Sequence, residues 1–142
     1  MYCESVNLMG INAKAIELSF IISNKKEKQM EQDQLVKNCI EACQQCVVAC
    51  LKCAQACLRE EKLEMMRKCI QTDLECAEIC ESTYKLLIMD SKPKLELVKI
   101  CLDLCEACAE ECEKHAAHGM EHCRECAEAC RSCAEACRKL VA

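Results

Sequence analysis

The sequence contains no tryptophan, one phenylalanine and two tyrosines among its 142 residues. Two glycines and one proline leave few turn-forming residues, which argues against a β-rich fold because strands need turns between them. No apolar run approaches the ~20 residues of a membrane-spanning helix, so we expect no membrane association. A net charge of −5, with no basic stripe and few aromatics for base stacking, argues against nucleic-acid binding.

What the chain has in abundance is cysteine, with nineteen residues, and helix-forming Ala, Glu, Lys and Leu. The apolar piece Ala15–Ser23 is short, is preceded by Glu4 and only one lysine, and is followed by NKKEKQ without a cleavage site of small residues, so we expect no signal peptide. We therefore expect a cytoplasmic protein. In a reducing compartment, cysteine indicates metal binding more often than disulfides, and the odd count excludes full intrachain pairing.

The composition divides the chain at about residue 30. Residues 1–29 hold one cysteine, Cys3, outside any repeat, and form an N-terminal extension. This extension is a short helix, a disordered tail or an over-long reading of the gene, and the sequence leaves all three open. Met30 opens the segment MEQDQLVKNC, and residues 30–142 are expected to form one domain.

Helical patterns dominate this domain and predict an all-α fold. The expected helices cover residues 32–60, 62–89, 94–116 and 120–141. The segment DSKP separates the second helix from the third, and Gly119 suits the C-terminal cap of the third. Because short connections make neighbouring helices antiparallel, we predict an antiparallel up-down-up-down four-helix bundle.

Eighteen cysteines recur at gaps of 3, 4 or 7 within these helices, which is the a/d pattern of a bundle core. Charged residues fall on the other faces, as expected for the outside of a bundle. The core is therefore predicted to be lined by cysteine. The candidate metal ligands are Cys39, Cys43, Cys46, Cys50, Cys53, Cys57, Cys69, Cys76, Cys80, Cys101, Cys105, Cys108, Cys112, Cys123, Cys126, Cys130, Cys133 and Cys137.

Neither packing nor disulfides explain this stripe well. Each replacement of Leu by Cys in a core loses contacts worth on the order of 1 kcal/mol. Helical i, i+4 pairs place their Cβ atoms ~5–6 Å apart, whereas a disulfide needs ~3.8 Å, although crosslinks between helices stay possible. The same pairs suit two sulfurs that share one ion, since metal–thiolate bonds measure ~2.3 Å.

Charge favours one metal over the others. A zinc ion with four thiolates keeps a net charge of −2, and burial of such a charge costs several kcal/mol per uncompensated ion. One Cu(I) per thiolate is neutral, and soft Cu(I) prefers soft sulfur. We therefore expect multiple Cu(I) ions per chain, about one for each inward cysteine, each displacing about one proton.

Other functions stay open beside this one. A zinc- or cadmium-thiolate protein like a metallothionein is the first alternative, and an iron–sulfur electron-transfer protein is the second. No four-cysteine set with cluster spacing stands apart from the stripes, which speaks against the second. A thiol–disulfide oxidoreductase is disfavoured because its CxxC pairs would lie inside buried helices. We expect a binding protein and not an enzyme.

The two ends of the predicted core differ. Beyond the last cysteines at one end, the stripes continue with Val36, Leu87, Val98 and Leu140. At the opposite end they continue with Met66, His115 and Met120, and His118 and His122 lie close by in the sequence. Thioether and imidazole groups bind Cu(I), so we predict that copper enters and leaves at this second end. Asp73 occupies a stripe position, either capping the cluster or leaning toward a partner; the sequence does not decide.

The runs CIEACQQCVVACLKCAQAC, CLDLCEACAEEC and CRECAEACRSCAEAC resemble those of the bacterial copper storage proteins, most closely the cytosolic type. The resemblance covers residues 30–142. It implies a four-helix bundle whose core cysteines bind many Cu(I) ions, histidines near the metal entrance, and assembly into a homotetramer. The expected partners are copper ions and a copper chaperone or a cuproprotein that receives the metal. Residues 1–29 have no counterpart in the resemblance.

Overall fold

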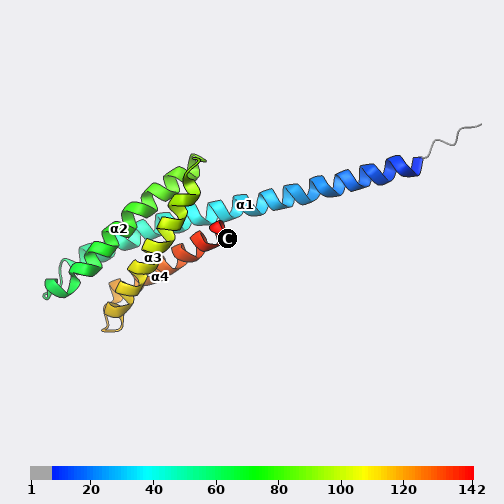
Figure 1. Ribbon diagram of the computed structural model, residues 1–142. Helices are drawn as coiled ribbons and strands as arrows, with labels where there is room; N and C mark the ends of the chain where they lie inside the picture. The colour runs from blue at the N-terminus through cyan, green and yellow to red at the C-terminus, as the bar shows by residue number, and fades with distance from the viewer. Residues whose placement is uncertain (1–7) are drawn as a thin grey trace, which may run out of the picture. The chain divides into compact units, whose positions relative to one another are not determined.

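The computed structural model describes residues 8–142, with side chains from residue 12 onward, so Cys3 lies outside the described residues. Four helices follow one another: α1 (Leu8–Cys57), α2 (Leu63–Ile88), α3 (Lys94–Ala116) and α4 (Glu121–Val141) (Figure 1). The chain divides into two units, Met1–Gln34 and Leu35–Ala142. The all-α prediction is confirmed, and the second unit is the four-helix bundle.

The connections between helices are short and are built from the residues that the sequence singles out. Pro93 is the residue before α3, where its missing N–H group costs no helical hydrogen bond. Asp90, after α2, and Gly119, after α3, adopt positive φ angles of 51° and 88°. The Gly119 N–H donates to the carbonyl of Ala116, which closes the last turn of α3.

The first helix differs most from its expected bounds. It begins at Leu8, whereas the sequence analysis placed its start at residue 32. Between residues 11 and 57 the chain contains neither glycine nor proline, so nothing in the local sequence interrupts the helix. The described part of the N-terminal extension is therefore helical and belongs to α1, so it is not a separate short helix.

Contacts between side chains show that neighbouring helices of the bundle run antiparallel. In α1 and α4, the Sγ atom of Cys39 lies 3.7 Å from that of Cys137, and Cys53 lies 3.9 Å from Cys123, so one helix ascends as the other descends. In α3 and α4, Arg131 pairs with Glu113 and Arg138 pairs with Glu106. The predicted up-down-up-down order is thus observed.

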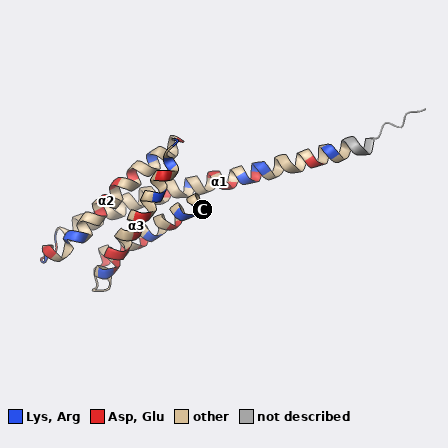
Figure 2. Ribbon diagram, viewed as in Figure 1, with Lys and Arg blue, Asp and Glu red and all other residues tan. Residues whose placement is uncertain are grey.

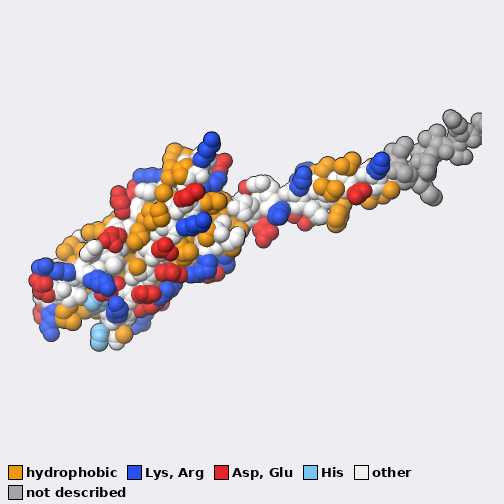
Figure 3. All heavy atoms as spheres, viewed as in Figure 1, with side chains coloured by type: hydrophobic (Ala, Val, Ile, Leu, Met, Phe, Trp, Pro, Cys, Tyr) orange, Lys and Arg blue, Asp and Glu red, His pale blue; other side chains and the backbone are white. Residues whose placement is uncertain are grey.

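Charged side chains are spread over the outside of the bundle (Figures 2 and 3). Cysteine and alanine make up most of its interior. Among the described residues, the buried polar or charged side chains are Asp73, Thr83 and Glu111. None of the helices in the part of the chain that the structure describes combines the length and the apolarity needed to cross a membrane.

Candidate metal centre

All eighteen cysteines of the four stripes are buried. Each has an exposed fraction of zero except Cys53, at 1%. All eighteen are free thiols. The helical a/d spacing therefore places every predicted ligand in the interior, where sulfur takes the place that leucine or isoleucine takes in an ordinary bundle.

Pairs of cysteines four residues apart on one helix bring their sulfurs close together. The Sγ–Sγ distances are 3.8 Å for Cys46 and Cys50, and 3.9 Å for Cys53 and Cys57. Similar pairs, at 3.9 to 4.0 Å, occur on each of the other helices. Two sulfurs that share one ion lie up to roughly 4–5 Å apart, so small side-chain movements bring each pair onto a metal.

Contacts between helices join these pairs into one network. The Sγ atom of Cys80, on α2, lies 3.6 Å from those of Cys101 and Cys105, on α3, and 3.9 Å from that of Cys133, on α4. Thiols of diagonally opposite helices also meet at the centre of the bundle: the Sγ atom of Cys43 on α1 lies 4.0 Å from that of Cys101 on α3. The thiols thus form a column along the bundle axis and not a set of separate clusters.

Groups of four thiols lie close enough to hold an ion together. Within each group, all four Sγ atoms lie within 4.8 Å of one another. Such groups are Cys43, Cys80, Cys101 and Cys133; Cys46, Cys50, Cys76 and Cys130; Cys46, Cys80, Cys105 and Cys133; Cys50, Cys108, Cys126 and Cys130; and Cys53, Cys57, Cys69 and Cys123. Several cysteines belong to two groups. Sulfurs that bridge neighbouring ions fit this sharing better than isolated four-thiolate sites, each of which needs its own ligands.

Asp73 lies inside this network, fully buried. Its Oδ1 atom accepts hydrogen bonds from Cys108 and Cys126, both at 3.2 Å, and from Cys112 at 3.5 Å. Burial, followed by the nearby Cys126 and Cys108 thiols, raises the pKa of Asp73 to about 11. The carboxyl group therefore stays protonated at neutral pH in the metal-free protein. The structure thus places Asp73 in the cluster and not on a surface.

The thiols influence one another's ionisation. Hydrogen bonds from Cys105 and Cys130 lower the pKa of the Cys46 thiol, because they stabilise its thiolate. Hydrogen bonds with Cys108 and Cys126, together with burial, raise the pKa of the Cys130 thiol. A thiolate at one position therefore relies on neighbours that keep their protons. Simultaneous ionisation of the whole column requires cations to enter it.

The interior supplies no cation of its own. Among residues 12–142, no lysine, arginine or histidine is buried, and Asp73 adds an acid to the core. Four-thiolate zinc sites would leave a charge of −2 each with no basic side chain nearby to offset it. Monovalent copper at one ion per thiolate leaves the column neutral. The electrostatics of the core thus favour Cu(I) over zinc.

One end of the column is sealed by aliphatic side chains. Val98 is fully buried, and Leu87 and Leu140 are 4% and 5% exposed. Val36 is partly buried against the same core. The fully buried Thr83 lies one helical turn beyond Cys80, toward this end. Among the described residues, aliphatic side chains thus close this end of the column, at the positions that the sequence indicates.

The opposite end is formed by the turn between α1 and α2 and the turn between α3 and α4. A surface cavity of about 430 Å³ lies there, lined by Met65, Met66 and Met120 with residues 59–62. Met66 is almost fully buried and Met120 partly so. Two of the predicted entrance residues therefore line one hollow at the end of the thiol column.

The histidines lie at this end but are not all brought together (Figure 3). The Nε2 atom of His115 lies 3.3 Å from Oε1 of Glu111, and that of His122 lies 3.8 Å from Oε1 of Glu60. Both rings are largely covered, with exposed fractions of 12% and 24%. His118 is exposed in the turn after α3 and does not line the hollow formed by the three methionines.

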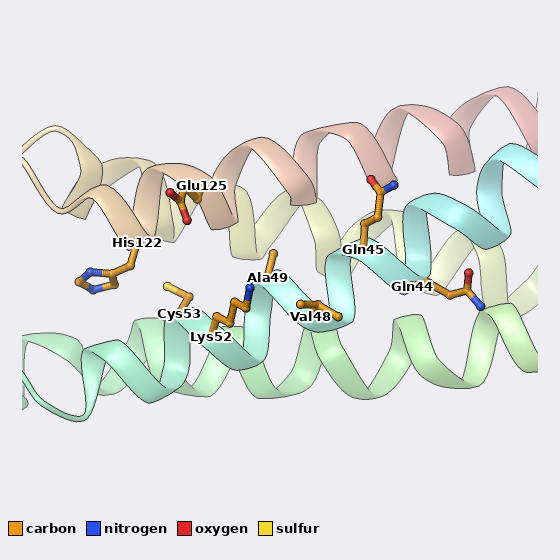
Figure 4. A pocket seen from close by; sticks show the side chains of 8 residues that line it. All are labelled: Gln44, Gln45, Val48, Ala49, Lys52, Cys53, His122 and Glu125. Atoms are coloured by element: carbon orange, nitrogen blue, oxygen red, sulfur yellow. The ribbon is translucent and has the colours of Figure 1, made fainter.

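His122 also lines a groove between α1 and α4. This groove has a volume of about 420 Å³ and reaches the edge of the thiol column at Cys53 (Figure 4). In Figure 4, His122 and Cys53 lie at one end of the groove, and Gln44 and Gln45 lie toward the other. His122 thus shares this groove with Cys53, a member of the thiol column.

Glu111 is a residue of this region that the sequence analysis did not single out. It is 6% exposed and contacts Lys114 at 3.0 Å and Lys68 at 3.4 Å. Burial raises its pKa, but the hydrogen bonds and charges of Lys114 and Lys68 outweigh this effect, so the net pKa is lowered. The only signal in the sequence is its place four residues before His115, one helical turn away.

Comparison with known families supports a metal role for this arrangement. The family profile described as copper storage protein matches residues 32–142. No curated protein sequence matches the chain. Several solved structures do.

A cytosolic copper storage protein from Streptomyces lividans, solved with five coppers, is 40% identical; the match covers 78% of this chain and 94% of that chain, with a TM-score of 0.75. The Cu(I)-bound copper storage protein BsCsp3 is 42% identical over 76% of this chain and 99% of its own, with a TM-score of 0.71. Metal-free copper storage protein 3 from Bacillus subtilis is 43% identical over 75% and 98%, with a TM-score of 0.69.

Proposed function

Because the chain belongs to the copper storage protein family, we propose that it stores and sequesters Cu(I) in the cytoplasm. The observation that carries the proposal is the shared column of eighteen buried thiols in a core without a basic side chain among the described residues. Such a column is costly as hydrocarbon packing and costly as a set of zinc sites. It is neutral and filled when each thiolate is matched by one monovalent ion.

The eighteen core cysteines are the proposed ligands. Each ion binds two sulfurs and each sulfur bridges two ions, so that about one Cu(I) enters for each thiol and about one proton leaves. The short i, i+4 pairs supply two-sulfur clamps along each helix, and the contacts between helices link the clamps. The domain that carries this activity spans residues 30–142, and residues 1–29 are an extension to it.

The histidine and methionine end is the proposed copper entrance. Met66 and Met120 share a cavity at the end of the column, and His115 and His122 lie in the same region. Their thioether and imidazole groups offer weaker ligands than bridging thiolates, so an ion is passed inward from them. His118, exposed in the adjoining turn, is the outermost of these groups. The opposite end is closed by the buried side chains of Val98, Leu87 and Leu140, which offer no ligand to copper.

Storage implies a donor or a recipient, and we propose a copper chaperone or a cuproprotein in that role. Assembly of bundles into a homotetramer is part of the same proposal. Val48, Leu51 and Leu74 support it, because each is about half exposed on the outside of the bundle. Apolar side chains of this size on an outer face are typical of contacts between subunits.

Competition between metals tests the proposal. Reduced, metal-free protein is titrated without oxygen with Cu(I) and, separately, with Zn(II), each against a chelator of known affinity. Storage of copper predicts that Cu(I) saturates near the number of core thiols and displaces bound zinc. Zinc saturation near a quarter of that number, four thiolates per ion, with weak copper uptake would instead establish the metallothionein-like function.

A further inference from the structure

The N-terminal half of α1 carries large apolar side chains that are exposed. Every side chain from residue 12 to residue 34 is exposed. Ile16, Leu18, Phe20 and Ile22 are 69%, 60%, 66% and 52% exposed, and Met30 is 70% exposed. Figure 3 shows hydrophobic side chains gathered along this part of the helix. Exposure of these apolar side chains to water is unfavourable in free energy, and burial against a partner would remove that cost.

This segment is not part of what the chain shares with the solved structures. The family profile begins at residue 32. The Streptomyces lividans and Bacillus subtilis structures are matched over 94% and 98% of their own lengths, yet they cover only 78% and 75% of this chain. The extension therefore adds a surface to a bundle that is complete without it.

The extension keeps the seven-residue register of the cysteine stripe. Counting back from Cys39 in alternating steps of three and four residues reaches Val36, Gln32, Gln29, Lys25, Ile22, Leu18 and Ala15. These are a and d positions in the same heptad frame as the core cysteines of α1. In this register the core cysteines of α1 are preceded by Val36, then by three polar residues, and then by Ile22, Leu18 and Ala15, whose side chains are exposed.

We propose that this stripe pairs with the same segment of a second copy of the chain, as a parallel coiled coil centred on Ala15, Leu18 and Ile22. Knobs-into-holes packing would cover the exposed Leu18 and Ile22 side chains. The polar a and d residues Lys25 and Gln29 would fix the register, as polar core positions do in short coiled coils.

The charged residues of this segment support both a second copy of the chain as the partner and a parallel orientation of the two helices. In a parallel pair, the g residue Lys28 of one helix faces the e residue Asp33 of the other, an attractive contact. Residues 12–34 together carry four lysines and four acidic residues, so the net charge of this exposed segment is zero. A helix that binds an anionic membrane surface needs a basic polar face, which this balance does not provide. A second copy therefore fits the segment better than lipid.

Two matched double variants of the full-length protein test the pairing. Leu18→Glu with Ile22→Glu places charge at a and d positions, whereas Ile16→Glu with Phe20→Glu places equal charge on the opposite face. Amide hydrogen exchange over residues 12–34 is followed at high and low protein concentration. We expect concentration-dependent protection of this segment in the wild type and in the Ile16/Phe20 variant, and its loss in the Leu18/Ile22 variant.

Copper capacity of both variants, expected to be unchanged, shows that the bundle remains folded. Exchange that is equally fast in all three proteins would overturn the proposal, and so would equal loss of protection in both variants. Flotation of the wild type with phosphatidylglycerol vesicles, abolished by either double variant, would assign the apolar segment to lipid and overturn it as well.

A charge exchange tests the parallel arrangement. Lys28→Glu places like charges opposite each other and should weaken self-association, measured by sedimentation equilibrium, roughly two- to fivefold. Adding Asp33→Lys to the same chain should restore it. An unchanged association constant in the single variant, or a further loss in the double variant, would contradict parallel pairing.

Discussion

The Oδ1 atom of Asp73 lies 3.2 Å from the Sγ atom of Cys126, and it lies equally close to the Sγ atom of Cys108. A carboxyl group on α2 thus links thiols of α3 and α4 at a position where the stripe would otherwise carry cysteine. The group has no basic neighbour in the core, and burial holds its pKa at about 11. Among the described residues it is the one carboxyl group with no exposed surface, since Glu111 keeps an exposed fraction of 6%.

The stability of the metal-free protein should therefore depend on pH through Asp73. Its pKa is raised in the folded state, so the folded protein binds more protons than the unfolded chain between pH 4 and pH 11. Stability is then greatest below the unfolded pKa and falls as pH rises, by about 1.4 kcal/mol per pH unit from this one group. Urea unfolding between pH 5 and pH 7 measures the slope, and Asp73→Asn should remove it.

Asp103→Asn is the matched control, because Asp103 lies exposed on α3. This variant should keep the wild-type slope. An Asp73→Asn protein whose stability falls with pH as steeply as the wild type would show that Asp73 is ionised in the folded state.

Cysteines at the middle and at the end of the column should contribute unequally to capacity. Cys80 lies within 4.0 Å of four other sulfurs, whereas Cys39, near the aliphatic end, lies 3.7 Å from Cys137. A bridging sulfur serves two ions, so Cys80→Ser should lower Cu(I) capacity by about one to two equivalents, and Cys39→Ser by about one at most. Competitive titration measures both; Ser82→Ala, on the surface of α2, is the control. Full capacity in Cys80→Ser would rule out a bridging role.

Loss of the entrance groups should change rates and not capacity. Replacing His115, His118 and Met120 together by alanine removes ligands outside the thiol column, so loading and release should slow severalfold while saturation stays nearly the same. Stopped-flow mixing with a Cu(I)–chelator complex measures the rates. Lys37→Ala with Lys139→Ala, which alters the aliphatic end, should leave them unchanged. Wild-type rates in the triple variant would refute the proposed route.

Copper loading should release protons in proportion to the ions bound. Because simultaneous ionisation of the column is opposed in the metal-free protein, each thiol that binds Cu(I) gives up its proton on loading. A pH-stat titration at neutral pH should record about one proton for each ion, up to saturation. Release of far fewer protons would mean that the thiols are already ionised before copper arrives.

The sequence predicted the bundle and the position of every core cysteine, because a heptad pattern is a local signal. Gaps of three and four residues fix which side of a helix a residue occupies, and short turns fix which helices are neighbours. The helix from Lys94 to Ala116 was placed at its observed bounds because Pro93 and Gly119 mark its ends. The start of α1 was misplaced because no breaker residue marks it, and the change in composition near Met30 is not a change in helix propensity.

Contacts between residues of different helices could not be predicted from the sequence. Whether Asp73 faces the cluster or a partner depends on the rotation of α2 against α3 and α4, which no local pattern records. The same holds for Glu111, which forms an ion pair with Lys68 from another helix. The histidines share a segment of sequence, yet His115 and His122 are turned toward different carboxylates while His118 is exposed, because the turn between α3 and α4 separates them.

The most direct measurement is the number of cuprous ions that one chain holds. Fully reduced protein is titrated with Cu(I) in the absence of oxygen, and the free metal is followed with a chromophoric chelator. A core filled by ions in place of hydrocarbon predicts tight uptake that ends near eighteen equivalents, one for each buried thiol. Saturation after one or two equivalents, with the remaining thiols still reactive toward a thiol reagent in the unfolded protein, would contradict it.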